Sequence, residues 1–101
     1  MITVRTSGSR AGQAVVRISD RESIYLPMIM LPSLVDSMRG LILFGTALPV
    51  RWQEDDRWTH LNLMRLGAEV VIWCGAVEIT IGLDEAEALI QAVKSYRAPS
   101  A

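Results

Sequence analysis

The sequence predicts an α+β fold with a mainly antiparallel sheet, arranged as two strand-rich units that are each closed by a helix (βββα twice). The stretch Ala76–Arg97 reads as one strand that leads into a capped helix, and a fainter version of this pattern occurs at Ser23–Gly40. The joints between the expected strands are short, and short joints make hairpins, whereas parallel strands need long crossovers. We expect a single domain over residues 1–101, with unit one at about 1–47 and unit two at about 50–97.

The first unit is expected to begin with two short strands and an inner one. Its first few residues alternate apolar and polar side chains, and Ala14, Val16 and Ile18 then share one face of the next strand. The segment Ile24–Leu31 is apolar on both faces, which predicts an inner strand with a bulge or an unpaired edge at Pro27. Because a small domain offers limited cover for such a strand, we expect this strand, or the joint between the halves, to drive self-association.

A short helix is expected to close this unit. Ser33 can cap its N-terminus, with Asp36 in place of the usual Glu of a capping box, and Gly40 can end it. Residues 41–48 suit either a strand or a continued helix, and residues 48–56 suit a linker between the units.

The second unit has a more regular pattern. Strands are expected at 57–66, 69–74 and 77–81, joined by turns at Gly67-Ala68 and Gly75. A helix then follows, with Asp84 as its cap, Glu87 completing a capping box, and a frayed tail after it at 98–101. Its core face has five residues at helical spacing: Ala86, Leu89, Ile90, Val93 and Tyr96.

The two strand-to-helix joints align at an offset of 51 residues, which indicates a possible pseudo-repeat. This alignment places Met28 and Met30 opposite Ile79 and Ile81. In this fold outline a strand-to-helix joint is used twice to close a sheet. The outline is similar to that of the Whirly-type single-strand DNA binders. The similarity implies a fold outline, and no residue or function is carried over from it.

The charges are unevenly distributed along a nearly neutral chain. Residues 1–53 hold six arginines against three acids, a net +3, and residues 54–101 hold four cations against eight acids, a net −4, so that the whole chain has a net charge of −1. Bulk electrostatics therefore do not attract the chain to nucleic acid, and the asymmetry suits self-association or a polar partner surface. Two charges and two prolines divide the apolar run 24–50 into pieces too short to cross a membrane. The first residues lack a signal-peptide pattern, so we expect a cytoplasmic protein without membrane contact.

Few residues offer catalytic or cofactor chemistry. Cys74 is the only cysteine, the acidic run 54–56 lacks the spacing of a calcium loop, and the glycine-bearing loop 7–12 lacks the Gly-Lys-Ser/Thr of a phosphate loop. A hairpin turn at Gly67-Ala68 would pair Cys74 with Leu61, so His60 would point to the opposite face and would not form a thiol–imidazole dyad. We therefore expect no cofactor, no metal and no enzymatic activity.

The strongest candidate for a binding site is the pair of dipeptides around the acidic run: Arg51-Trp52 and Arg57-Trp58. Tryptophan and arginine are the residue types most enriched at binding hot spots, and both can stack on bases. The alternative is that one or both tryptophans cover the edge of the core between the units. We expect Arg51, Trp52, Arg57 and Trp58 to form one partner-binding patch.

Three functions are compatible with these observations. The first is a non-enzymatic protein-interaction module, a homodimer that acts as a regulator or small inhibitor of a larger machine through an unidentified protein partner. The second is a single-stranded nucleic-acid-binding protein whose sheet face combines arginines and tryptophans: Arg5, Arg17, Arg21, Trp52 and Trp58. The third is a small enzyme with a site near His60. The first is favoured because the chain is nearly neutral and lacks catalytic motifs.

Overall fold

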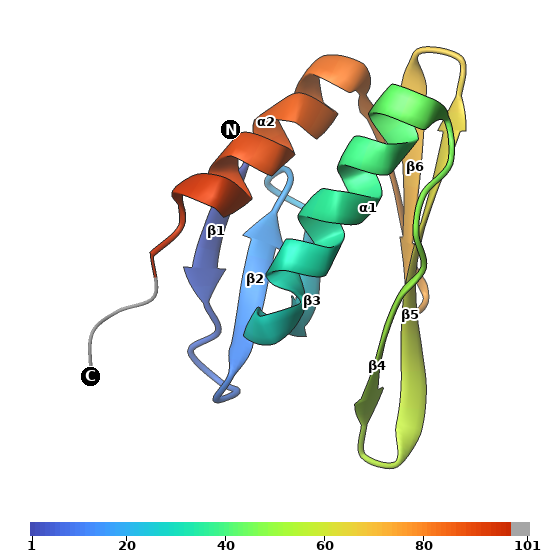
Figure 1. Cartoon of the computed structure of the whole chain (residues 1–101). Helices are drawn as coiled ribbons and strands as arrows, with labels where there is room; N and C mark the ends of the chain where they lie inside the picture. The colour runs from blue at the N-terminus through green and yellow to red at the C-terminus, as the bar shows by residue number, and fades with distance from the viewer. Residues whose placement is uncertain (98–101) are drawn as a thin grey trace.

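The computed structural model describes residues 1–97, which form two antiparallel sheets and two helices (Figure 1). The tail expected at residues 98–101 lies outside the described part of the chain. The first sheet contains β1 (Thr3–Thr6), β2 (Gln13–Arg17) and β3 (Ser23–Pro27), and it is followed by the 3₁₀ turn η1 (Met28–Met30) and by α1 (Leu31–Phe44). The second sheet contains β4 (Val50–Glu54), β5 (Arg57–Leu66), β6 (Glu69–Cys74) and β7 (Val77–Gly82), and α2 (Leu83–Ser95) follows it. The predicted α+β class is confirmed, and the second unit has one strand more than expected.

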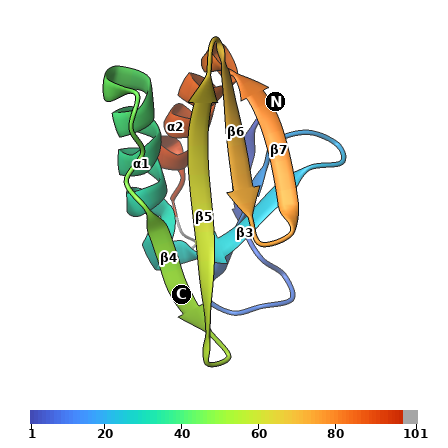
Figure 2. The ribbon, with the colours of Figure 1, turned by 90° about the vertical axis from the view of Figure 1, so that its right-hand side faces the viewer.

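The two helices form one layer that contacts both sheets. They run side by side in front of the first sheet, with the second sheet beside them (Figure 1). Figure 2 looks directly at the second sheet, with α2 behind it and α1 at its left. Both helices contact the second sheet, α1 at β4 and β5 and α2 at β6 and β7. Buried residues from both units form one hydrophobic cluster, including Val16, Leu26, Met38, Ile72 and Leu89. Each sheet therefore has an inner face in the core and an outer face that points away from the helices.

The third strand is shorter than the sequence predicted. It ends at Pro27, and Met28 and Met30 lie in η1 rather than in a strand. Its inward residues Ile24 and Leu26 are buried within the chain, so the expected two-sided apolar strand does not exist. Proline has no N–H for a sheet ladder, which explains why the strand stops there. The order of elements recurs in the two units, but the offset of 51 residues does not align their strands.

The first helix is longer than expected, and its predicted ends are wrong. Ser33 lies inside the helix, and the end is at Gly45, whose φ is 75° and whose N–H donates to the carbonyl of Leu41. Gly40 lies in the helix interior, where a Cβ would come within 3.0 Å of the Thr46 carbonyl oxygen. The glycine therefore allows the loop after the helix to fold back closely.

The expected linker at 48–56 is largely a strand. β4 pairs with β5 over five residues, from Val50 opposite Leu61 to Glu54 opposite Arg57. The connecting turn is Asp55-Asp56, whose φ angles of 50° and 62° suit the tight two-residue hairpins that aspartate tolerates. The acidic run therefore serves as a turn.

The final helix begins one residue before its predicted cap. Gly82 is the N-cap, and its N–H donates to the Glu85 side chain at 3.1 Å, so Asp84 and Glu87 do not form the expected capping box. Four of the five predicted core residues, Ala86, Leu89, Ile90 and Val93, are buried, whereas Tyr96 lies just past the end of the helix and is half-buried. The strands 57–66, 69–74 and 77–82 agree with the sequence prediction to within one residue.

Candidate functional site

The candidate site is the outer face of the second sheet, which looks away from the helices (Figure 2). Alternation along each strand sends one set of side chains into the core, such as Trp52, Leu61 and Ile72, and the next set outward. Strand register places the outward set in rows across the four strands. We call this set the outer face: Arg51, Gln53, Trp58, His60, Asn62, Met64, Leu66, Glu69, Val71, Trp73, Glu78 and Thr80.

One end of the outer face has an arginine stacked on a tryptophan. The guanidinium carbon of Arg51 lies 5.0 Å from the centroid of the Trp58 ring, within the range of a cation–π contact. β4 and β5 place them on the same face, because Arg51 pairs with His60, two residues beyond Trp58. Trp58 is 55% exposed, so much of the residue is available to a partner.

The predicted patch of Arg51, Trp52, Arg57 and Trp58 is divided between the two faces of the sheet. Trp52 is only 6% exposed and belongs to the core, and its Nε1–H has no hydrogen-bond partner among the described residues. Arg57 lies on the same face of the sheet as Glu54, with which it pairs, and on the opposite face from Trp58. Adjacent residues of a strand point to opposite faces, so only Arg51 and Trp58 come together.

A second tryptophan on this face was not singled out from the sequence. Trp73 pairs with Asn62 on one side and with Glu78 on the other, and its Nε1–H donates to the Glu78 carboxylate at 2.6 Å. The sequence does contain a signal for an apolar residue on this face, because β6 is apolar on both faces. One set of its residues had to face away from the core.

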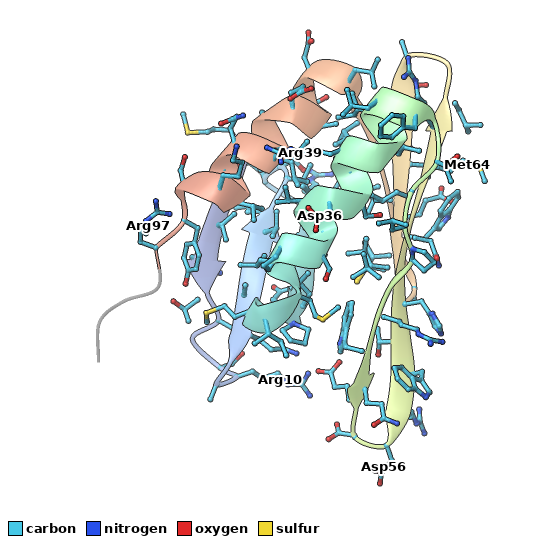
Figure 3. All side chains as sticks on the ribbon, in the orientation of Figure 1. Arg10, Asp36, Arg39, Asp56, Met64 and Arg97 are labelled. Carbon is cyan, nitrogen blue, oxygen red and sulfur yellow. The ribbon has the colours of Figure 1, made fainter. Side chains whose placement is uncertain are left out.

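The far end of the outer face is apolar and open. Met64 is 47% exposed and points away from the helices (Figure 3), and Leu66 beyond it is also exposed. Val71 pairs with Met64 across β5 and β6, and it is buried by its neighbours although it lies on this face. The charged residues are Arg51 at the β4 edge, Glu78 at the β7 edge and Glu69 at the end of β6, so the face combines apolar surface with one positive and two negative charges.

The geometry around His60 does not provide a nucleophile. Cys74 pairs with Leu61 as predicted, so the histidine and the thiol lie on opposite sides of the sheet. Burial raises the pKa of the Cys74 thiol, and the negative charge of Glu54 raises it further. The thiol therefore stays protonated at neutral pH, whereas the thiolate is the nucleophile. Within residues 1–97, no group of three or more His, Cys, Asp or Glu side chains is placed to hold a metal ion.

The arginines proposed for nucleic-acid binding belong to the other sheet. Arg5 and Arg17 lie on the outer side of β1 and β2, opposite the half-buried Val4 and the buried Val16 in the alternation. Trp58 is on the second sheet, and the two sheets face different directions (Figures 1 and 2). The arginines and tryptophans therefore do not form one stacking platform.

Comparisons with known proteins supply no further identification. No protein-family model, curated protein or solved structure matches this chain. Among the described residues, neither helix has the length and apolar character needed to cross a membrane.

Proposed function

We propose that this chain is a non-enzymatic protein-interaction module and that the outer face of its second sheet binds a second copy of the chain. The observation that carries the proposal is the exposed Trp58, stacked by Arg51, on a sheet face that also presents Trp73 and Met64. Tryptophan and arginine contribute disproportionately to interfaces when they become desolvated at the centre of a contact.

Charge complementarity favours a second copy as the occupant. Arg51 and Glu78 lie on the opposite edge strands β4 and β7. Arg51 is level with His60 and Glu78 with Asn62, so the two residues are in neighbouring rows of the outer face. A two-fold axis that runs along the strands places the β4 edge of one copy over the β7 edge of the other, so each Arg51 comes within reach of Glu78 of the other copy. In such an isologous interface every contact occurs twice.

The same features favour a protein partner over a nucleic acid or an enzyme substrate. The outer face has two carboxylates, Glu69 and Glu78, against one arginine, Arg51. Single-stranded nucleic acid instead requires a basic track beside its stacking side chains. His60 stands alone there without a nucleophile or an orienting carboxylate. A cytoplasmic dimer of this kind would act as a regulator or small inhibitor of a larger machine by occupying a surface.

Truncation of the exposed tryptophan provides the test. Trp58→Ala removes a side chain that makes no contribution to the core, and loss of a desolvated tryptophan costs more than about 2 kcal/mol, or roughly thirtyfold in Kd. We expect sedimentation equilibrium to show at least this increase in the dimer Kd.

Asp55→Asn is the matched control at the tip of the same hairpin. Asparagine also tolerates the positive φ of this position, so the turn is kept. The control is expected to leave the dimer Kd unchanged. Light scattering that shows only monomer for the wild-type chain at high micromolar concentration would contradict the proposed dimer.

A further inference from the structure

A groove between α1 and α2 lies on the helical side of the molecule, away from the outer face (Figure 1). It has a volume of about 560 Å³ and is lined by η1, by the first half of α1 and by the last turn of α2. Because the helices cover the inner side of the second sheet, a dimer formed through the outer face leaves this groove open (Figures 1 and 2).

The floor of the groove is apolar and held in place. Leu31, Val35 and Val93 are buried at its base, and Met28 and Tyr96 close one end. The Tyr96 hydroxyl lies 3.8 Å from the Met28 sulfur and 3.3 Å from the Thr6 hydroxyl, which fixes the end of α2 on the first sheet. The apolar floor is therefore preformed in the absence of a partner.

The rim of the groove is basic. Arg39, Lys94 and Arg97 surround it against a single acid, Asp36, and Figure 3 shows Arg39 between the two helices with Arg97 beyond the end of α2. Neither of the two ion pairs formed by the described residues involves these side chains. Arg97 instead donates to the carbonyls of Lys94 and Tyr96 at 3.0 and 2.9 Å, which keeps its positive charge at the rim.

We propose that this groove binds an acidic amphipathic helix of a partner protein. An apolar floor matches the apolar stripe of such a helix at i, i+3, i+4 and i+7, and the cations match acidic residues beside that stripe. The α1 residues that line it, from 31 to 39, extend over about 12 Å, or two helical turns of a partner. A small amphiphile is disfavoured because such ligands need most of their surface enclosed, and here Ile29, 84% exposed, and Pro32 leave the groove shallow.

A synthetic peptide of about 14 residues serves as the probe, with leucines at i, i+3, i+4 and i+7 and glutamates elsewhere. Fluorescence anisotropy of its labelled form is measured against the full-length chain. A peptide of the same composition with the leucine spacing broken, and one with lysines in place of the glutamates, are the peptide controls. We expect saturable binding of the first peptide only, weakened by added salt.

The protein variants remove the rim charge without touching the core. Arg39→Gln with Lys94→Gln is expected to raise the peptide Kd at least about tenfold and to reduce its salt dependence. Arg5→Gln with Arg21→Gln removes the same net charge elsewhere and is expected to leave the Kd unchanged, as is Trp58→Ala, which acts on the dimer alone.

Three results would overturn the proposal. They are equal binding of the control peptides, equal loss of affinity in both double variants, and no binding of the acidic peptide. Saturable binding of sodium decanoate without binding of the peptide would instead assign the groove to a small amphiphile.

Discussion

At the residue scale, the two tryptophans of the hairpin β4–β5 have opposite environments, although each follows an arginine. Trp52 fills the core and Trp58 stands on the outer face. Strand alternation separates the two tryptophans once both strands are known, but the sequence predicts a linker at residues 48–56, and a linker has no alternation that would place Trp52. The face of the sheet to which a side chain points can be predicted only after its strand is recognised.

The buried indole of Trp52 leads to a testable difference between two substitutions. Trp52→Ala should lower the free energy of unfolding by about 3–5 kcal/mol, because it leaves a large cavity. Trp52→Phe should cost less than about 1.5 kcal/mol, because it keeps most of the volume and removes an N–H that has no partner. Urea unfolding measures both values. A cost for phenylalanine close to that for alanine would show that the Nε1–H makes a hydrogen bond after all.

At the element scale, the last helix was predictable because its apolar residues repeat at helical spacing over three turns. Leu89→Ala should lower the free energy of unfolding by about 2–5 kcal/mol, since Leu89 is fully buried in the core. Glu87→Ala on the exposed side of the same helix should change it by less than about 0.5 kcal/mol. Thermal melting of the two variants checks which face of the helix packs on the core. Equal melting temperatures would mean that Leu89 is not on that face.

Other elements could not be placed from local pattern. η1 and the start of α1 form a continuous apolar run, Met28–Leu31, in which strand and helix periods look alike. α1 passes through Gly40 because tertiary contact with the loop at Thr46 outweighs the cost of a glycine in a helix. Ser37, buried in that helix, donates to the Leu48 carbonyl at 2.5 Å and fixes the same loop. Such contacts join residues far apart in sequence, so no local signal reports them.

At the scale of the whole molecule, the two units are connected by more than their shared core. The Glu54 carboxylate accepts hydrogen bonds from Arg10 at 2.6 Å and from Gln13 at 2.7 Å, so the β1–β2 turn is tied to the end of β4. The sequence predicted the two units and their charge asymmetry, but not this pairing between them. It also could not predict which sheet faces the helices leave uncovered, and for this reason our proposal places self-association on the second sheet rather than on Ile24–Leu31.

We propose that two copies meet through their outer faces with Arg51 opposite Glu78, and mixing two charge variants tests this arrangement. Arg51→Glu places like charges together in a homodimer, and so does Glu78→Arg. A mixture of the two variants pairs opposite charges at both contacts. Sedimentation velocity should therefore show each variant as a monomer alone and the equimolar mixture as a dimer. If the single variants dimerise like the wild-type chain, or if the mixture stays monomeric, the outer face is not the interface.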